Sequence, residues 1–360
     1  MPDAAVQFLV PEGIEDDERV SGGNVYDRRI GEALRAQGVD VRMVRVGADG
    51  GLEVASALSA LRRDDVVLID GLLAVAAARV LEAQSTRLRM VVLAHMVASA
   101  LPRIQDRAST AERERVALNA ARRVIATSEW TRSELVARAL AEPDRIVVAR
   151  PGTDPAPTAT GSASGGHLLC VGAVAFHKGQ DVLVNALAGM DDLPGWSCSI
   201  VGSLDTDPEF ATRTAAAIRS AGLTERIELP GVLTGRRLAE AYRAADLVIV
   251  PSRAESYGMV AAEAVARGIP VVAARVGGVP EAIAGSTAAV LIPPDDPVAL
   301  RAVLRQWWAE PPRRAVLKAE AVRSRTMRRT WAESARIAAT VLRRTRPGAG
   351  VVESERRRAG

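Results

Sequence analysis

Residues 245–274 read ADLVIVPSRAESYGMVAAEAVARGIPVVAA, with two short apolar runs on either side of an alanine-rich stretch. The runs DLVIVPS and IPVVAA show no alternation of polar and apolar positions, which is typical of strands buried on both faces. The stretch between them predicts a helix that begins near Gly258 and is ended by Gly268 as a left-handed cap. The segment therefore predicts a strand, a helix and a second, parallel strand.

The same alternation of apolar runs and helical patterns fills most of the 360-residue chain. A first series includes AAVQFLV, DVRMVRV, DDVVLID and RMVVLAH, and a second series starts at HLLCVGAV. Between them, residues 150–167 are rich in proline, glycine, serine and threonine, which predicts a flexible joint near residues 155–166. Two series of buried parallel strands joined in this way predict two doubly wound α/β domains.

Composition limits the class of protein. Hydrophobic residues make up 48% of the chain and charged residues 25%, which fits a soluble globular protein. No apolar run reaches the ~18 residues needed to cross a bilayer, and the N-terminus lacks the pattern of a signal peptide, so we expect a cytoplasmic protein. Cys170 and Cys198 lie in apolar runs and are predicted to be core residues, and the three histidines lack metal-ligand spacing.

The net charge of +4 is unevenly distributed, because sixteen lysines and arginines but only five acidic residues follow from Arg301 onward. Such a basic segment fits a solvated helix face with a frayed end, or contact with nucleic acid or an anionic membrane. No aromatic platform or DNA-binding motif accompanies the charge, so we expect no nucleic-acid partner. Peripheral membrane contact stays open.

Ligands of open parallel sheets bind beyond the carboxyl ends of the strands, so the residues after each run are the candidates. No Gly-x-Gly-x-x-Gly opens the first unit, which argues against a nicotinamide dehydrogenase. Glu255 follows a predicted strand, and the amides of residues 257–260 begin a helix, where a phosphate is favoured. Glu263, among alanines inside this helix, needs hydroxyl or amide donors, which a sugar or ribose supplies. Ordinary surface carboxylates are the alternative for both glutamates.

ADLVIVPSRAESYGMVAAEAVARGIPVVAARVGGVPEAI resembles the donor-binding signature of the retaining glycosyltransferases of family 4. VSGGNVYDRRIGEAL, VIATSEWTRSEL, RIVVARPGTDPAP and LLCVGAVAFHKGQDVLVNAL are similar to further segments of that family. The resemblance implies the GT-B fold, α/β with two Rossmann-like domains facing each other across a cleft. We expect an acceptor-side domain at 1–158, a donor-binding domain at 159–325, and a terminal helix at 326–346 that returns to the first domain. The tail 347–360 is expected to be disordered.

The resemblance assigns roles to residues of the C-terminal half. Glu255 is expected at the hydroxyls of the donor hexose, Glu263 at the ribose, and Lys178 at the leaving diphosphate as a point charge. A surface lysine before a helix is the alternative for Lys178. The backbone expected to line the phosphates is that of Ser256, Tyr257, Gly258, Met259 and Val260.

In the N-terminal half, the resemblance points to two glycines and a histidine. Gly22 and Gly23 would let the backbone approach the phosphates or the acceptor closely. His95 ends the run RMVVLAH, where the family often has a histidine that reaches the reacting sugar; a satisfied structural histidine is the alternative. Asp70 ends DDVVLID and is either a residue of the cleft or a helix N-cap.

One position departs from the family pattern. The family usually has an arginine where this chain has Ala173, five residues before Lys178, so half of the cationic clamp on the diphosphate is missing. We expect Arg253 to replace it and count it among the donor-binding residues. The other replacements considered are His177, if protonated, Arg28 and Arg103.

These residues predict a retaining, metal-independent hexosyltransferase that uses a nucleotide diphosphate sugar, with UDP slightly favoured over GDP. The acceptor is a hydroxyl or amine of a small or lipid-linked molecule. Asp205 and Asp207 are interpreted as capping and solvated residues, so no metal or other cofactor is expected. A catalytically impaired nucleotide-sugar-binding protein, or an epimerase or phosphorylase of the same fold, is the alternative.

Overall fold

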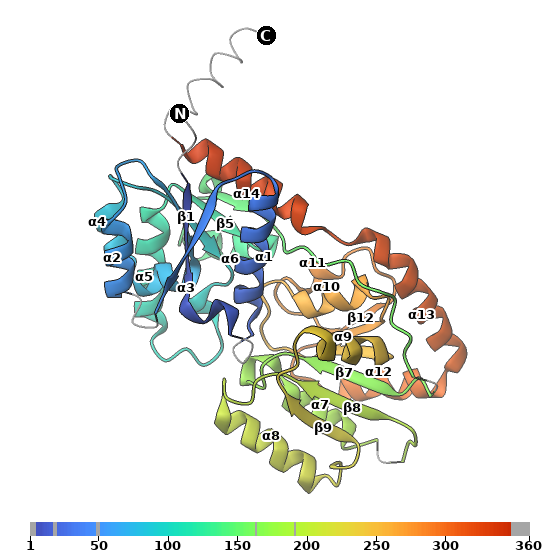
Figure 1. Ribbon diagram of the computed structural model, residues 1–360. Coiled ribbons are helices and arrows are strands. Elements are labelled where there is room, and N and C mark those ends of the chain that lie inside the picture. The colour runs from blue at the N-terminus through green and yellow to red at the C-terminus, as the bar shows by residue number, and fades with distance from the viewer. Residues whose placement is uncertain (1–4, 17–19, 48–50, 163, 191, 347–360) are drawn as a thin grey trace. The chain divides into compact units, whose positions relative to one another are not determined.

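The computed structural model of the chain forms two compact units (Figure 1). Unit 1 is made of residues 1–15, 22–152 and 329–360, and unit 2 of residues 16–21 and 153–328. The structure describes residues 5–16, 20–47, 51–162, 164–190 and 192–346. The predicted disordered tail, residues 347–360, lies outside the described residues.

Unit 1 is built on a six-stranded parallel sheet with the strand order β2-β1-β3-β4-β5-β6. The strands are β1 (Val6–Pro11), β2 (Val41–Val46), β3 (Val66–Asp70), β4 (Arg89–Ala94), β5 (Arg123–Ala126) and β6 (Ile146–Val148). The helices are α1 (Gly22–Ala36), α2 (Gly51–Ser59), α3 (Gly71–Ala76), α4 (Ala78–Gln84), α5 (Arg107–Ala120), α6 (Glu129–Ala137) and α14 (Trp331–Thr345), with short 3-10 turns η1 (Glu12–Glu15), η2 (Ala98–Ala100) and η3 (Pro143–Arg145).

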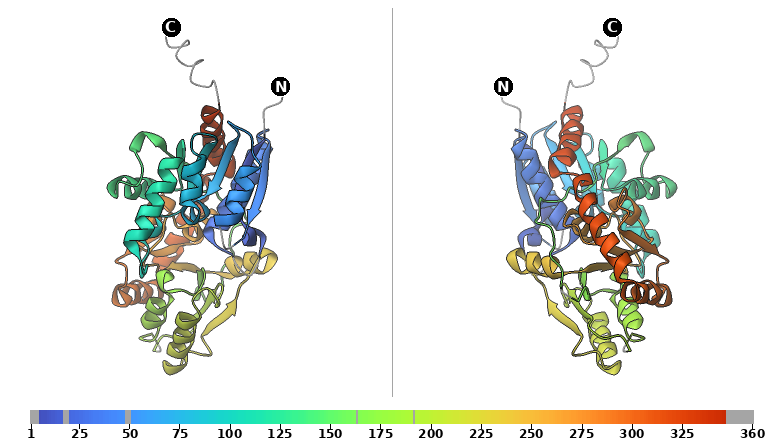
Figure 2. Two further views of the ribbon diagram at one scale, coloured as in Figure 1. Left: turned by 90° about the vertical axis from the view of Figure 1, so that its left-hand side faces the viewer. Right: turned by 90° about the vertical axis from the view of Figure 1, so that its right-hand side faces the viewer.

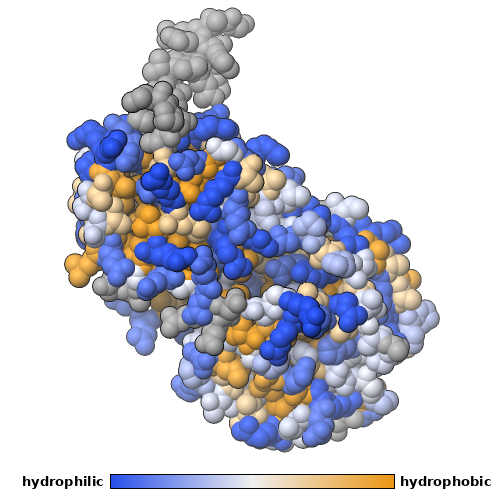
Figure 3. Space-filling view, viewed as in Figure 1, coloured by the Kyte–Doolittle hydropathy of each residue, from blue (hydrophilic) through white to orange (hydrophobic). Residues whose placement is uncertain are grey.

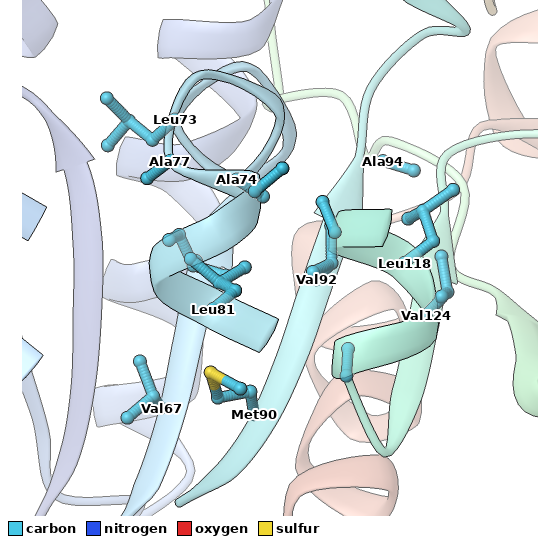
Figure 4. Close-up of a cluster of buried hydrophobic side chains, with 14 of the residues drawn as sticks. Val67, Leu73, Ala74, Ala77, Leu81, Met90, Val92, Ala94, Leu118 and Val124 are labelled. Carbon is cyan, nitrogen blue, oxygen red and sulfur yellow. The ribbon is translucent and has the colours of Figure 1, made fainter. Parts of the chain in front are cut away.

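Two apolar cores lie on the two faces of this sheet, because successive side chains of a strand point to opposite sides. One core joins the strands to α2 through α6, and Figure 4 shows Val67, Leu81, Met90, Leu118 and Val124 meeting in it. The other core joins the strands to α1 and α14, which lie side by side (Figure 2). Both faces are covered by helices, which explains why the inner strands β1, β3 and β4 are largely apolar.

Unit 2 repeats this architecture with the strand order β12-β11-β10-β7-β8-β9. The strands are β7 (His167–Val171), β8 (Ser197–Val201), β9 (Ile227–Gly231), β10 (Leu247–Val250), β11 (Val271–Ala274) and β12 (Ala289–Ile292). The helices are α7 (Gln180–Leu187), α8 (Pro208–Ser220), α9 (Gly235–Ala244), α10 (Met259–Ala266), α11 (Val279–Ala282), α12 (Pro297–Ala309) and α13 (Pro311–Ser324), with 3-10 turns η4 (Phe176–Lys178) and η5 (Arg325–Met327).

The chain order of these strands reverses between β7 and β10, which are adjacent in the sheet of unit 2. Open α/β sheets bind ligands at such a switch point, beyond the carboxyl ends of the strands. The prediction of two doubly wound parallel-sheet domains is confirmed. The boundary between the units falls after Gly152 and again after Arg328, a few residues away from the predicted limits.

The surface, the two cysteines and Asp207 can be compared with what the sequence predicts. The face seen in Figure 3 mixes hydrophilic side chains with smaller apolar areas, as most protein surfaces do. Cys170 and Cys198 are buried, and Asp207 caps α8 by accepting from the amide of Phe210 at 3.1 Å, as predicted. Within the described residues, no helix has the length and apolar character needed to span a membrane.

Candidate active site

Lys178 and Glu255 lie together at the switch point of unit 2. Lys178 ends η4, which follows β7, and Glu255 lies in the loop that follows β10. The Nζ atom of Lys178 is 2.5 Å from Oε1 of Glu255, and the hydroxyl of Ser252 donates to the same oxygen at 3.0 Å. The side chains are 24% and 13% exposed, so the ion pair is accessible to a ligand.

Two glycines hold the loop that carries Glu255. The amide of Gly278 donates to the carbonyl oxygen of Glu255 at 3.0 Å. Gly277 has a φ of 52°, and a Cβ atom there would lie 1.6 Å from that same carbonyl oxygen; a Cβ at Gly278 would lie 2.3 Å from the carbonyl oxygen of Ser256. No side chain fits at either position. These glycines were missed as site residues, although a glycine pair two residues after the apolar run VVAA was a visible signal.

The first turn of α10 follows this loop in the chain. The N-cap residue is Gly258, in a left-handed conformation with a φ of 98°, and no side chain of the described residues caps the helix. Ser256, Tyr257 and Gly258 form the approach to the helix, and α10 starts at Met259 and Val260. Uncapped amides at a helix start favour a bound anion. The five predicted phosphate-lining residues follow Glu255 directly in the chain, and their contact with a phosphate stays a prediction.

Glu263 has a protein partner that the sequence did not reveal. The hydroxyl of Tyr242, a fully buried residue of α9, donates to Oε2 of Glu263 at 2.7 Å. Burial, with a contribution from Glu263, raises the pKa of Tyr242 well above its ordinary value, so the hydroxyl keeps its proton. The guanidinium of Arg267 lies 4.3 Å from the centre of the Tyr242 ring. Tyr242 thus supplies one donor that we had expected from a ribose.

Arg253 is a structural residue in this geometry. Its side chain donates to the carbonyl oxygen of Phe176 at 2.9 Å, to both carboxylate oxygens of Asp181 at 2.8 and 2.9 Å, and twice to Asp295 at 3.0 and 2.7 Å. These five contacts use all five N–H donors of a guanidinium. The expectation that Arg253 replaces the family arginine is therefore not supported, because no donor is left for a phosphate.

His177 does not supply the missing charge either. Burial lowers the pKa of His177 below 6.5, and the nearby Lys178 lowers it further, so the ring is neutral at pH 7. At Ala173 itself, the carbonyl oxygen accepts from the side-chain amide of Gln180 at 2.9 Å. Arg28 and Arg103, the other two replacements considered, belong to unit 1.

In unit 1, His95 lies directly after β4 and contacts two carboxylates. Its Nε2 atom is 2.7 Å from Oδ1 of Asp27 in α1 and 3.3 Å from Oδ2 of Asp70 at the end of β3. The other oxygen of Asp70 caps α3, since it accepts from the amides of Leu72 and Leu73. Asp70 is therefore the N-cap that was one of its two predicted roles, and it also faces His95.

These three side chains are almost completely buried, and their charges are coupled. Burial lowers the pKa of His95, but Asp27 and Asp70 outweigh it and raise the pKa to about 10. Burial raises the pKa of Asp27 to about 6, against the opposing effect of His95. At neutral pH the ring is thus an imidazolium beside the ionised carboxylate of Asp27.

Asp27 was missed in the sequence, although helical periodicity places it on the apolar face of α1 with Ile30 and Leu34. Gly22 and Gly23 form the first turn of the same helix. Their predicted approach to phosphates or an acceptor stays a prediction.

Two family models match this chain on both sides of the joint. Residues 164–324 match the model described as Glycosyl transferases group 1, and residues 52–157 match Glycosyltransferase Family 4. Both parts of the chain thus match glycosyltransferase families, and the predicted resemblance to family 4 is confirmed. The first match contains the Lys178–Glu255 pair and α10, and the second contains Asp70 and His95.

Curated relatives that this chain matches include D-inositol 3-phosphate glycosyltransferases. The protein of Thermomonospora curvata is 38% identical over 58% of this chain and 54% of its own length. The protein of Kineococcus radiotolerans is 33% identical over 64% of this chain and 59% of its own length. The chain spans about half the length of the curated relatives it matches.

Similar solved structures support the GT-B fold of the chain. Sucrose-phosphate synthase from Thermosynechococcus elongatus is similar with a TM-score of 0.79 and 21% identity, over 95% of this chain and 99% of that one. Anabaena HepE in complex with UDP-glucose has a TM-score of 0.75 and 20% identity, over 94% and 99%. At these identities the likeness establishes the fold.

Proposed function

We propose that this protein is a retaining hexosyltransferase that moves a hexose from a nucleotide diphosphate sugar to a hydroxyl or amine of an acceptor. The observation that carries the proposal is the Lys178–Glu255 pair beside the uncapped start of α10. One loop cluster thus offers a cation, a carboxylate and backbone amides, which match the diphosphate and the hydroxyls of such a donor.

In the proposed reaction the ligand separates the ion pair. Glu255 accepts from hydroxyls of the donor hexose, and Lys178 and the α10 amides stabilise the charge that develops on the leaving diphosphate. Glu263 accepts from the ribose. The bond between the anomeric carbon and the diphosphate oxygen breaks as the acceptor oxygen or nitrogen bonds to that carbon from the same face, and the proton of the acceptor passes to the leaving diphosphate. The anomeric configuration is thus kept, and no enzymatic nucleophile is required. This scheme assigns no step to a metal ion.

The printed names of similar proteins support the substrate class. HepE was solved with UDP-glucose, which favours UDP over GDP as the nucleotide. The inositol 3-phosphate glycosyltransferases act on a polyol, which favours a hydroxyl as the acceptor group.

A second candidate is a protein that binds nucleotide sugars without turnover. The observation that favours it is Ala173, which stands where the family usually has an arginine. The side chain of Arg253 is fully engaged and His177 is neutral, so Lys178 is the one of these three residues in unit 2 that can place a positive charge at the diphosphate. Weaker stabilisation of the leaving diphosphate would then reduce turnover while leaving binding intact.

A thermal-shift screen with UDP-, GDP- and ADP-sugars tests the proposal, followed by an assay for release of the nucleoside diphosphate with and without EDTA. We expect at least one donor to raise the Tm, since a ligand at a hundred times its Kd stabilises by about 2.7 kcal/mol. Lys178→Ala and Glu263→Ala should abolish most of this shift. No shift with any donor would contradict both candidates, and a shift without release would favour the second.

The chain offers a matched control for Lys178. Lys318, in α13, is the other lysine of the sequence, and its Nζ atom is 2.5 Å from the buried Asp246. Lys318→Ala should lower the Tm of the free protein and leave the ligand-induced shift unchanged.

A further inference from the structure

The buried group of Asp27, Asp70 and His95 includes an unsatisfied oxygen. Asp27 is 0% exposed, and its Oδ2 atom has no hydrogen-bond partner within the described part of the chain. The three residues come from α1, the end of β3 and the residue after β4, at the edge of the unit 1 sheet where parallel strands end. Such a cluster is expensive to bury unless each charge has a defined partner.

A shared proton, and not a metal ion, accounts for the distances in this group. Within the described residues, one ligand atom of each side chain lies within 4.8 Å of the others, which would allow a metal. However, Nε2 of His95 and Oδ1 of Asp27 are 2.7 Å apart, which is the length of a direct charge-assisted hydrogen bond. Asp70 Oδ1 is already committed to the two amides of α3.

We propose that Asp27 is a positioning residue that fixes the His95 ring, with the Nε2 proton held by Asp27 and Asp70 and the Nδ1 proton left to donate to a ligand oxygen. The ring is then a cationic hydrogen-bond donor of fixed orientation. This inference rests on the proposed function and on the role that the family resemblance implies for His95, which is to reach the reacting sugar. It adds a carboxylate in α1 to the residues on which that contact depends.

The other polar groups around the ring do not compete for its proton. Tyr26 meets the ring edge to face at 5.2 Å, and burial raises the pKa of its hydroxyl, which donates to the carbonyl oxygen of Ala149. Glu114 of α5 lines the same small cavity as His95, but its carboxylate accepts from the amides of Ala98 and Ser99. Asp27 and Asp70 are therefore the carboxylates that control the ring.

Ring ¹⁵N NMR of the full chain with Asp27→Asn tests this arrangement, because the sequence holds only three histidines and His95→Gln assigns the signal. In the wild type we expect both nitrogens of His95 to stay protonated from pH 6 to pH 9. In Asp27→Asn the ring should lose a proton within this range. If the proposed transfer occurs, kcat should fall about tenfold or more, with KM for the donor changed less than threefold.

Tyr26→Phe is the matched control, since it removes the neighbouring hydroxyl contact and keeps Asp27. It should lower stability without changing the His95 signals or the pH profile of kcat. Identical His95 signals in wild type and Asp27→Asn would overturn the inference, as would stoichiometric Co²⁺ binding that displaces the Nε2 proton. If the His95 ¹⁵N signals behaved as expected but the protein had no transferase activity, the proposed function would be wrong, whereas the positioning of the His95 ring by Asp27 would be confirmed.

Discussion

The two units place charged groups at the carboxyl edges of similar sheets, but they hold them differently. In unit 2, Lys178 and Glu255 are partly exposed and sit on loops. In unit 1, His95 is 8% exposed, and its two carboxylate partners are 0% and 2% exposed. An exposed ion pair contributes about 0–1 kcal/mol, whereas breaking a buried one costs about 3–5 kcal/mol. A ligand can therefore separate the first cluster, while the second is suited to keep its geometry.

The largest effect is expected from removing the exposed cation. Lys178→Met keeps most of the side-chain volume and should reduce kcat by about 10²–10³, the usual loss for one group that stabilises transition-state charge. Steady-state kinetics with the preferred donor would measure it. Lys318→Met is the control and should stay within threefold of the wild type. A loss below threefold for Lys178→Met would show that the accessible cluster of unit 2 does no chemistry.

The next largest effect concerns the glycine that holds the Glu255 loop. Gly277→Ala should lower the free energy of unfolding by about 3 kcal/mol or more, because a Cβ there meets a carbonyl oxygen in addition to the strain of a positive φ. Gly235 separates these two causes, since it has a φ of 51° and nothing within 4 Å of an added Cβ.

Gly235→Ala should cost only about 1 kcal/mol, the strain alone. Urea unfolding of both variants provides the comparison. Equal losses would mean that the contact between Gly277 and the Glu255 loop is not tight in solution.

A smaller effect is expected from Tyr242→Phe, which removes the hydroxyl that donates to Glu263. A buried hydrogen bond to a charged group is worth about 1.5–3 kcal/mol, and the partial exposure of Glu263 places the loss near the lower value. Chemical denaturation of Tyr242→Phe, Glu263→Gln and the double variant gives the coupling energy between the two residues. Additive losses would show that the contact contributes no stability.

The smallest effect, per pH unit, is a dependence of stability on pH. The pKa of His95 is raised from 6.5 to about 10, so its contribution to stability is fully present below pH 6.5 and is lost as the pH rises through about 10. The stability gap between wild type and His95→Gln should therefore shrink by about 1 kcal/mol for each pH unit between pH 6.5 and pH 10. Urea midpoints across this range measure it. If the stability difference between wild type and His95→Gln stayed constant with pH, the charge of His95 would contribute no stability, and the buried cluster would not differ from the accessible one in this respect.

The fold was predictable because its signals are local. The run LVIV of β10 is apolar throughout, since helices cover both sheet faces, and Gly268 ends α10 in the predicted left-handed conformation. Lys178 and Glu255 could be assigned to one site from the sequence, because both come after strands and parallel strands end at one edge, but their ion pair was not predicted.

The remaining site residues depend on contacts between distant segments. Arg253 looked like a free cation, yet its partners Asp181 and Asp295 are 72 and 42 positions away in the sequence. Asp27 and Tyr242 lie on helix faces whose packing partners cannot be read from periodicity. A polar residue on the apolar face of a helix indicates that it has a hydrogen-bond partner, but the tertiary structure is needed to identify that partner.

The close packing of Gly277 and Gly278 on the backbone of Glu255 and Ser256 has a consequence for engineering. The loop that carries Glu255 packs on the loop after the following strand, so the two loops can keep their conformations only together. Exchanging residues 251–258 alone for those of another transferase would leave the new loop without a backbone surface that fits it. A graft intended to change the sugar must carry residues 275–279 along with it.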